Sequence, residues 1–153
     1  MPVLAPQTFR PDVFFEGAWR AWGLVKDLTG QVVERFEVRG EGQVRSLARV
    51  FEIEERYVFS SGREDALTWR LSTDDLGVFS GVEVASGARG QGRQDGQGYE
   101  WRFVRKTPTA LGARRVSLRA QYHQLTDEDA LCMTTLHWAG LRIATLSSLY
   151  RRD

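Results

Sequence analysis

The chain has very few of the residues that build disulfides and metal sites. Of 153 residues, one is a cysteine, Cys132, and two are histidines, His123 and His137. A single cysteine excludes an internal disulfide and a Cys-x-x-Cys site, and it is consistent with a reducing compartment. The two histidines do not cluster with carboxylates in the sequence, which does not favour a zinc site. We therefore expect no metal and no cofactor.

Long apolar runs and an excess of one charge are also missing. No stretch approaches the roughly 18 apolar residues of a membrane-spanning helix. Residues 1–10 lack the basic run and apolar segment of a secretory signal, so we expect a cytoplasmic protein. The 21 basic and 20 acidic residues give a net charge of +1, which creates no field to attract nucleic acid or an anionic membrane. The sequence leaves a homodimer open.

Aromatic residues are plentiful, and many of them alternate with polar ones. The clearest case is residues 51–59, in which Phe51, Ile53, Tyr57 and Phe59 are separated by residues that are mostly charged. Alternation with period two and glycine-rich turns predict antiparallel strands joined by hairpins. We predict an all-β fold, a single antiparallel up-and-down barrel of about eight or nine strands. The predicted strands cover residues 19–26, 31–38, 51–59, 67–71, 78–85, 99–103, 116–122, 131–138 and 141–150.

The domain organisation follows from the distribution of proline. Pro2, Pro6 and Pro11 all lie near the start of the chain, and proline disfavours regular strands. Residues 1–12 are therefore predicted to form an irregular arm, and residues 13–153 the barrel domain. With 153 residues, the chain is long enough for one core.

The order of several short motifs carries a resemblance to a known family. They are Phe15-Glu16-Gly17, Trp22-Gly23, the turn at residues 27–30, the set Glu55, Tyr57, Phe59, Gly62 and Trp69, and the later segments 81–85, 99–103 and 140–143. In this order they resemble an uncharacterised bacterial family of lipocalin-like, calycin-type proteins of unknown function. The resemblance implies a barrel of the lipocalin type. It carries no activity to this chain, because Leu67, Tyr122 and Met133-Thr134 lie where the chain departs from the family pattern.

The broader lipocalin resemblance concerns the start of the first strand. The pair Gly17-x-Trp19 resembles the lipocalin opening, which implies a tryptophan closing one end of the barrel. A basic residue of the last strand, Arg142 or Arg151, would then stack on its ring.

Glu55 is the most unusual candidate for a functional residue, because it falls in phase with an aromatic face. A buried carboxylate needs a partner or a raised pKa. It could serve as a ligand anchor or a general base, or it could pair structurally with an inward arginine or lie at the barrel mouth. Glu34 is a weaker case of the same kind. The predicted ligand-binding residues are Trp22, Glu55, Tyr57, Trp69, Phe79, Trp101 and Tyr122, with Trp138 as a further candidate for the same pocket.

Other chemistry-bearing residues favour structural interpretations. His137 shares phase with Leu131 and Met133 and is predicted to face inward, where a core histidine is favoured over a haem ligand. His123 is predicted to face solvent. The glycine-rich segment 87–98 is predicted to be a hairpin or barrel-mouth loop, since it lacks the P-loop pattern. Cys132 is predicted to be buried and inert.

Three hypotheses for function remain open. The favoured one is a lipocalin-like barrel without catalytic residues that binds a small hydrophobic or amphipathic ligand. The second is an isomerase or hydratase in which Glu55 works with a tyrosine, so that a carboxylate and a phenol converge in a concave site. The third is a barrel filled with side chains that serves as a protein interaction module.

Overall fold

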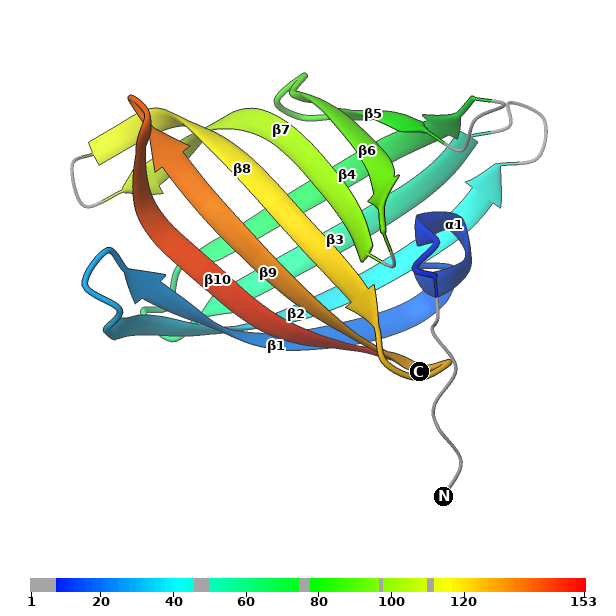
Figure 1. The fold of residues 1–153 in the computed structure, drawn as a ribbon, viewed down its shortest axis with the longest axis horizontal. Helices are drawn as coiled ribbons and strands as arrows, with labels where there is room; N and C mark the ends of the chain where they lie inside the picture. The colour runs from blue at the N-terminus through cyan, green and yellow to red at the C-terminus, as the bar shows by residue number, and fades with distance from the viewer. Residues whose placement is uncertain (1–7, 46–49, 75–77, 97, 110–111) are drawn as a thin grey trace.

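Ten antiparallel strands form one closed barrel in the computed structural model of the chain (Figure 1). The structure describes residues 8–45, 50–74, 78–96, 98–109 and 112–153. Each strand pairs with the next one along the chain, and β1 pairs with β10 to close the barrel. The elements are α1 (Pro11–Phe14), β1 (Gly17–Asp27), β2 (Val32–Arg45), β3 (Val50–Phe59), β4 (Glu64–Thr73), β5 (Phe79–Glu83), β6 (Arg89–Asp95), β7 (Gly98–Thr109), β8 (Gly112–Gln124), β9 (Asp129–Trp138) and β10 (Leu141–Arg152). The predicted up-and-down barrel is confirmed, but the predicted eight or nine strands are corrected to ten.

The strand missing from the prediction is β6, which lies within the glycine-rich segment 87–98. It pairs with β5 on one side and with β7 on the other. Gly90 and Gly92 are its buried residues, and a Cβ at either one would overlap the ring of Trp101 or Tyr99 on β7. The inner positions of β6 are therefore filled by aromatic rings of the neighbouring strand. This is why a strand with no apolar side chains of its own still belongs to the barrel.

The direction of the side chains on β9 differs from the prediction. Ala130, Cys132 and Leu136 are buried, whereas Leu131 and Met133 are 45% and 50% exposed. His137 shares the phase of the two exposed residues and so lies on the outer face. This strand carries apolar residues on both faces, so its alternation alone does not identify the inner one.

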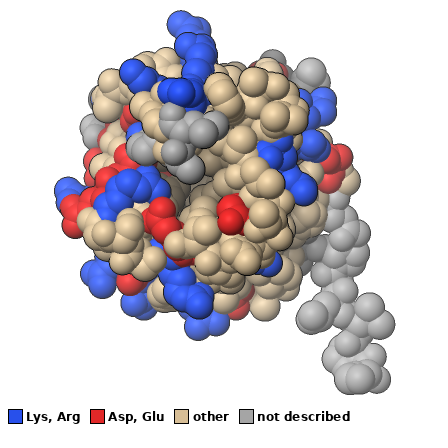
Figure 2. Space-filling view, turned by 90° about the vertical axis from the view of Figure 1, so that its left-hand side faces the viewer, with Lys and Arg blue, Asp and Glu red and all other residues tan. Residues whose placement is uncertain are grey.

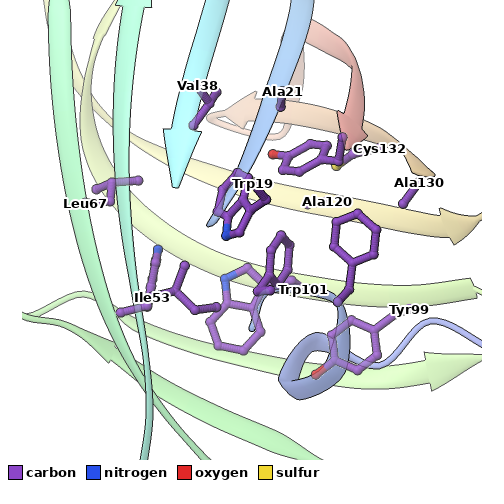
Figure 3. Packing of buried hydrophobic residues seen from close by; sticks show 14 of the residues in the cluster. Trp19, Ala21, Val38, Ile53, Leu67, Tyr99, Trp101, Ala120, Ala130 and Cys132 are labelled. Carbon is purple, nitrogen blue, oxygen red and sulfur yellow. The ribbon is translucent and has the colours of Figure 1, made fainter. Parts of the chain in front are cut away.

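Aromatic residues from the start of the chain close one end of the barrel. Helix α1 lies at the right-hand end of the barrel in Figure 1. Phe9 and Phe15 are buried there, with Phe9 stacked on Tyr122 at a centroid distance of 4.9 Å and Phe15 packed on Trp19 at the same distance. Figure 3 shows Trp19 within the cluster of buried apolar residues. The division into an arm at 1–12 and a barrel at 13–153 stays a prediction, and residues 1–7 lie outside the described ranges.

Trp19 occupies the place that the lipocalin resemblance implies, but its neighbour is different. It is 1% exposed, and its ring packs against Tyr150 on β10 at a centroid distance of 5.4 Å. Arg151 instead pairs with Asp129 at 2.8 Å. Arg142 is exposed near the other end of β10. The expectation of an arginine stacked on Trp19 is therefore corrected, with a tyrosine in its place.

Candidate functional site

The interior of the barrel holds a cavity of about 820 Å³. Ligand pockets in proteins commonly measure about 300–1,000 Å³ and are mostly apolar. The inward residues of most strands form its wall, and its floor is formed by Pro11 of α1 together with Phe9 and Phe15 on either side of that helix. The barrel is therefore not filled by its own side chains, which removes the premise of the interaction-module hypothesis.

The cavity extends to the end of the barrel opposite α1. Its lining there includes Leu28, in the turn after β1, and Trp138 and Ile143, on either side of the turn between β9 and β10. Leu28 is 70% exposed, so this part of the lining meets solvent. Figure 2 looks onto this end and shows a hollowed surface with charged side chains around it. A ligand could therefore reach the interior from this side.

The structure places most of the predicted ligand-binding residues on the cavity wall. Glu55, Tyr57, Trp69, Trp101 and Tyr122 line it, as does Trp138.

Two of the predicted residues lie elsewhere. Trp22 points outward from β1, is 39% exposed and carries Arg20 over its ring. Phe79 is buried against Tyr99 but does not line the cavity. Trp22 is displaced because Trp19 and Ala21 set the inner phase of β1. Whether the lining residues bind a ligand stays a prediction.

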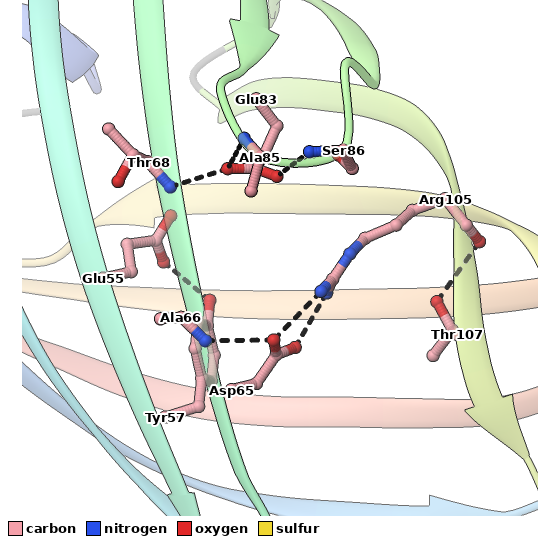
Figure 4. A network of polar contacts seen from close by, with 10 residues as sticks. All are labelled: Glu55, Tyr57, Asp65, Ala66, Thr68, Glu83, Ala85, Ser86, Arg105 and Thr107. Carbon is pink, nitrogen blue, oxygen red and sulfur yellow. Dashed lines mark hydrogen bonds and ion pairs between the residues drawn. The ribbon is translucent and has the colours of Figure 1, made fainter.

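Glu55 and Tyr57 form a hydrogen-bonded pair in the cavity. They lie two residues apart on β3, so their side chains leave the same face of the strand. The phenol of Tyr57 donates to Oε2 of Glu55 at 2.6 Å (Figure 4). Burial raises the pKa of Glu55 from its ordinary value of 4.5 to about 7, and the hydrogen bond from Tyr57 acts in the opposite direction. The carboxyl group is therefore poised to gain or lose a proton near neutral pH.

A second polar pair, Asp65 and Arg105, also lines the cavity. The guanidinium of Arg105 donates two hydrogen bonds to the carboxylate of Asp65, at 2.7 and 2.9 Å (Figure 4). Asp65 also accepts a hydrogen bond from the backbone N–H of Ala66. Burial raises the pKa of Asp65, but the hydrogen bond and charge of Arg105 outweigh it and leave that pKa below its ordinary value. The inward arginine thus pairs with Asp65 and not with Glu55.

The Asp65–Arg105 pair bridges a gap in the backbone hydrogen bonding of the barrel wall, between β4 and β7. Strand β4 pairs with β5 only over residues 69–73, and β7 pairs with β6 only over 98–103. In the described part of the chain, β5 does not pair with residues 64–68 of β4, and β6 does not pair with residues 104–109 of β7. These two segments therefore have no described strand between them. The ion pair joins these two segments. Neither residue is among the candidates predicted from the sequence, although Asp65 is in phase with the inward Leu67.

Glu83, at the end of β5, is 1% exposed and has a structural role. Its carboxylate accepts hydrogen bonds from the backbone N–H groups of Thr68, Ala85 and Ser86, at 2.9, 3.3 and 2.9 Å (Figure 4). Burial raises the pKa of Glu83, but these hydrogen bonds together lower it below its ordinary value. The carboxylate therefore stays ionised and fixes the turn after β5 beside β4.

Glu34 lies in the part of the lining that faces the open end. Its carboxylate accepts a hydrogen bond from the hydroxyl of Ser61 at 3.0 Å and lies 3.7 Å from the guanidinium of Arg63. Arg63 in turn covers the ring of Phe59, at 3.8 Å from its centroid. Glu34 is therefore engaged with its neighbours in the loop between β3 and β4.

The remaining candidates do not form a chemical centre. His123 is exposed, and the described residues contain no group of three or more His, Cys, Asp and Glu side chains that could hold a metal ion. Cys132 is buried as predicted, and burial raises the pKa of its thiol to about 12. No helix in the described part of the chain is long and apolar enough to cross a membrane.

Comparisons with known proteins bear on the family and the fold. A family model described as "Protein of unknown function (DUF3833)" matches residues 4–152. The search of the curated proteins found no match. Among solved structures, the S-type phycobiliprotein lyase CPES from Guillardia theta is similar, with a TM-score of 0.65 and 10% identity over 90% of this chain and 88% of that one. A de novo designed fluorescence-activating β-barrel has a TM-score of 0.49 and 14% identity, over 95% and 100% of the two chains.

Proposed function

The chain belongs to the DUF3833 family of proteins of unknown function, and we propose that it binds a small hydrophobic or amphipathic molecule inside its barrel. The resemblance to a lipocalin-like family of unknown function is thereby confirmed, and the bacterial origin of that family stays a prediction. The likeness to the phycobiliprotein lyase supports a lipocalin-like fold.

The observation that carries this proposal is the cavity of about 820 Å³. Protein interiors are packed nearly as densely as organic crystals, so a barrel without a ligand to hold is expected to fill its own interior. Here the wall combines aromatic rings, such as Trp69 and Phe103 in edge-to-face contact, with a few polar groups gathered on β3, β4 and β7. An apolar wall with few polar groups is the arrangement that holds a ligand and orients one end of it.

Native mass spectrometry of gently purified protein, with analysis of its organic extract, tests the proposal. We expect a discrete excess mass that disappears on denaturation. Ala144 lines the cavity on β10, and Thr145 points the other way from the same strand. Ala144→Trp should weaken ligand binding about tenfold and so lower the bound fraction, because a ligand and the indole compete for the same space and about 1.4 kcal/mol corresponds to a factor of ten in Kd. Thr145→Trp is the matched control and should retain the ligand.

If native mass spectrometry shows only the mass of the protein without a ligand, the next measurement is titration with Nile red, a neutral apolar dye. Failure of the dye to bind wild-type protein, together with the bare mass, would overturn the proposal. If Ala144→Trp and Thr145→Trp weaken dye binding equally, the dye binds outside the cavity.

A second candidate function is supported by the contact between Glu55 and Tyr57. A carboxyl group and a phenol 2.6 Å apart in a concave site, with the pKa of the carboxyl at about 7, match the requirements of a general base for an isomerase or hydratase. Tyr57 would hold the carboxylate in place, and Glu55 would remove a proton from a carbon of the bound molecule.

Isotope exchange separates this candidate from simple binding. Protein incubated in D₂O with the extracted ligand should introduce deuterium at one carbon, detected by mass spectrometry. Glu55→Gln should slow this exchange by about 10²-fold or more, within the usual range for loss of a general base. A ligand that gains no deuterium over the background rate would identify the protein as a carrier.

A further inference from the structure

We propose that the polar wall of the cavity binds a positively charged nitrogen of its amphipathic ligand, so that the preferred ligand is a hydrophobic amine and not a fatty acid. This inference rests on the proposed ligand-binding function and specifies the chemistry of the ligand. Glu55 is the anchor that the geometry assigns to the nitrogen.

The charges on the cavity wall do not favour a carboxylate ligand. Among the described lining residues, four are acidic, two are arginines, and none is lysine or histidine. The four acids are Asp27, Glu34, Glu55 and Asp65, and the arginines are Arg63 and Arg105. With all of them ionised, the wall carries two more negative charges than positive ones. A cationic ligand would reduce this imbalance, whereas an anionic one would increase it.

Arg105, the arginine whose charge acts on Glu55, is not free to receive a carboxylate. Arg105 uses both ends of its guanidinium on Asp65, and Arg63 lies between Glu34 and the ring of Phe59. A fatty-acid headgroup would have to displace Asp65 from Arg105 and leave that carboxylate partly buried without its partner. Removing one partner of a buried ion pair is strongly unfavourable.

Glu55 offers the complementary group. Its Oε2 accepts the hydrogen bond from Tyr57, and Oε1 has no hydrogen-bond partner among the described residues. Because the phenol proton is already committed to Glu55, the pair presents acceptors to the cavity and no free donor when Glu55 is ionised. An ammonium group is a donor with no acceptor, so it matches this site.

The aromatic rings that pack on Tyr57 also suit such a ligand. Tyr57 packs against Phe36 and Phe59, at centroid distances of 6.2 Å each, and all three rings line the cavity. Ring faces attract ammonium groups through their quadrupole, an effect that strengthens when the cation is desolvated. The same rings would hold the alkyl part of the ligand.

The pH dependence of binding has opposite signs for the two ligand classes. The charged or titratable groups around Glu55 are Tyr57 on β3, Asp65 on β4, Glu83 on β5, Arg105 on β7, Tyr122 on β8, Cys132 on β9 and Tyr150 on β10. The carboxyl group has a pKa of about 7. An alkylammonium requires ionised Glu55 and should bind more tightly as pH rises from about 6 to about 8, since amines stay protonated there. A fatty acid requires the protonated group and should bind more weakly over the same range.

Calorimetric titration with dodecylamine, dodecanol and dodecanoate, each kept below its micellar concentration or its solubility limit, tests the inference. We expect wild-type protein near pH 8 to bind dodecylamine about tenfold more tightly than dodecanoate, the factor expected from one charge-assisted hydrogen bond. Glu55→Gln keeps an acceptor for Tyr57 and should remove both this preference and its pH dependence. Glu54→Gln, at an exposed position on the same strand, is the matched control.

The three probes separate the two proposals. If dodecanoate binds as tightly as dodecylamine, the inference fails and the binding function stands. If dodecylamine binds equally well to wild-type protein and to Glu55→Gln, the assignment of Glu55 is overturned. If none of the probes binds wild-type protein, including the uncharged dodecanol, the proposed function itself fails.

Discussion

Glu55→Gln is expected to raise the free energy of unfolding by about 3 kcal/mol near pH 8 relative to wild-type protein. The pKa of Glu55 is raised from 4.5 to about 7 in the folded protein, chiefly by burial. Between these values the folded state binds more protons than the unfolded state, so stability falls as pH rises through this window. Each pKa unit corresponds to about 1.36 kcal/mol. Glutamine carries no charge and avoids this cost.

Urea denaturation at a series of pH values measures the effect. The two proteins should have similar stability below about pH 4.5, where Glu55 is protonated in both states, and should diverge up to about pH 7. The difference between the two profiles isolates Glu55 from the other titrating groups. Glu54→Gln removes the same formal charge from an exposed position on the same strand and should follow wild type. Parallel profiles for wild type and Glu55→Gln would contradict the raised pKa.

A gain in stability on removing Glu55 would also bear on function. Proteins usually retain a destabilising group in the interior only where it does something that an uncharged residue cannot. Here the cost appears when the carboxyl group ionises inside the cavity, and a bound cation would offset it. The same residue therefore links the stability of the empty protein to the chemistry of the proposed ligand.

The sequence predicts the inner face well where polar and apolar residues alternate strictly. On β3, Glu54 and Arg56 mark the outer face, so Glu55 and Tyr57 are assigned to the inner one, and the structure places both on the cavity wall. On β1 and β9 apolar residues occupy both faces. The alternation on these strands therefore predicts the wrong side for Trp22 and His137, because a shift of one residue reverses every side chain of a strand.

Other features depend on contacts between distant segments. Strand β6 has glycine at inner positions because Tyr99 and Trp101 of the next strand fill the space, and a local pattern of apolar residues cannot reveal this. Asp65 and Arg105 are 40 residues apart, and they meet only because β5 and β6 are short. The open interior depends on the sum of side-chain volumes over the whole barrel, so the sequence could not decide between a filled barrel and a hollow one.

Arg105→Met is expected to lower the free energy of unfolding by about 2–3 kcal/mol, because it leaves Asp65 partly buried without its cation. The side chains of Arg105 and Asp65 are 21% and 26% exposed, so the penalty should fall somewhat below the roughly 3–5 kcal/mol of a fully buried pair. Chemical denaturation measures it. The matched control is Arg39→Met, which removes a partner of Glu37 at a position that is 76% exposed and should cost less than about 1 kcal/mol.

The double variant Asp65→Leu/Arg105→Met tests whether the ion pair itself stabilises the barrel. The alternative is that each partner matters only because removing it leaves the other charge unpaired. Replacing both partners with apolar residues removes the buried charges together, so stability should return to within about 1 kcal/mol of wild type. Hydrogen exchange should still reveal the lost connection. Because β4 and β7 have no strand between them at residues 64–68 and 104–109, their backbone amides should exchange faster in both variants, while the fully paired β9 stays protected. Equal protection of these segments in all three proteins would mean that the wall holds together here without the ion pair.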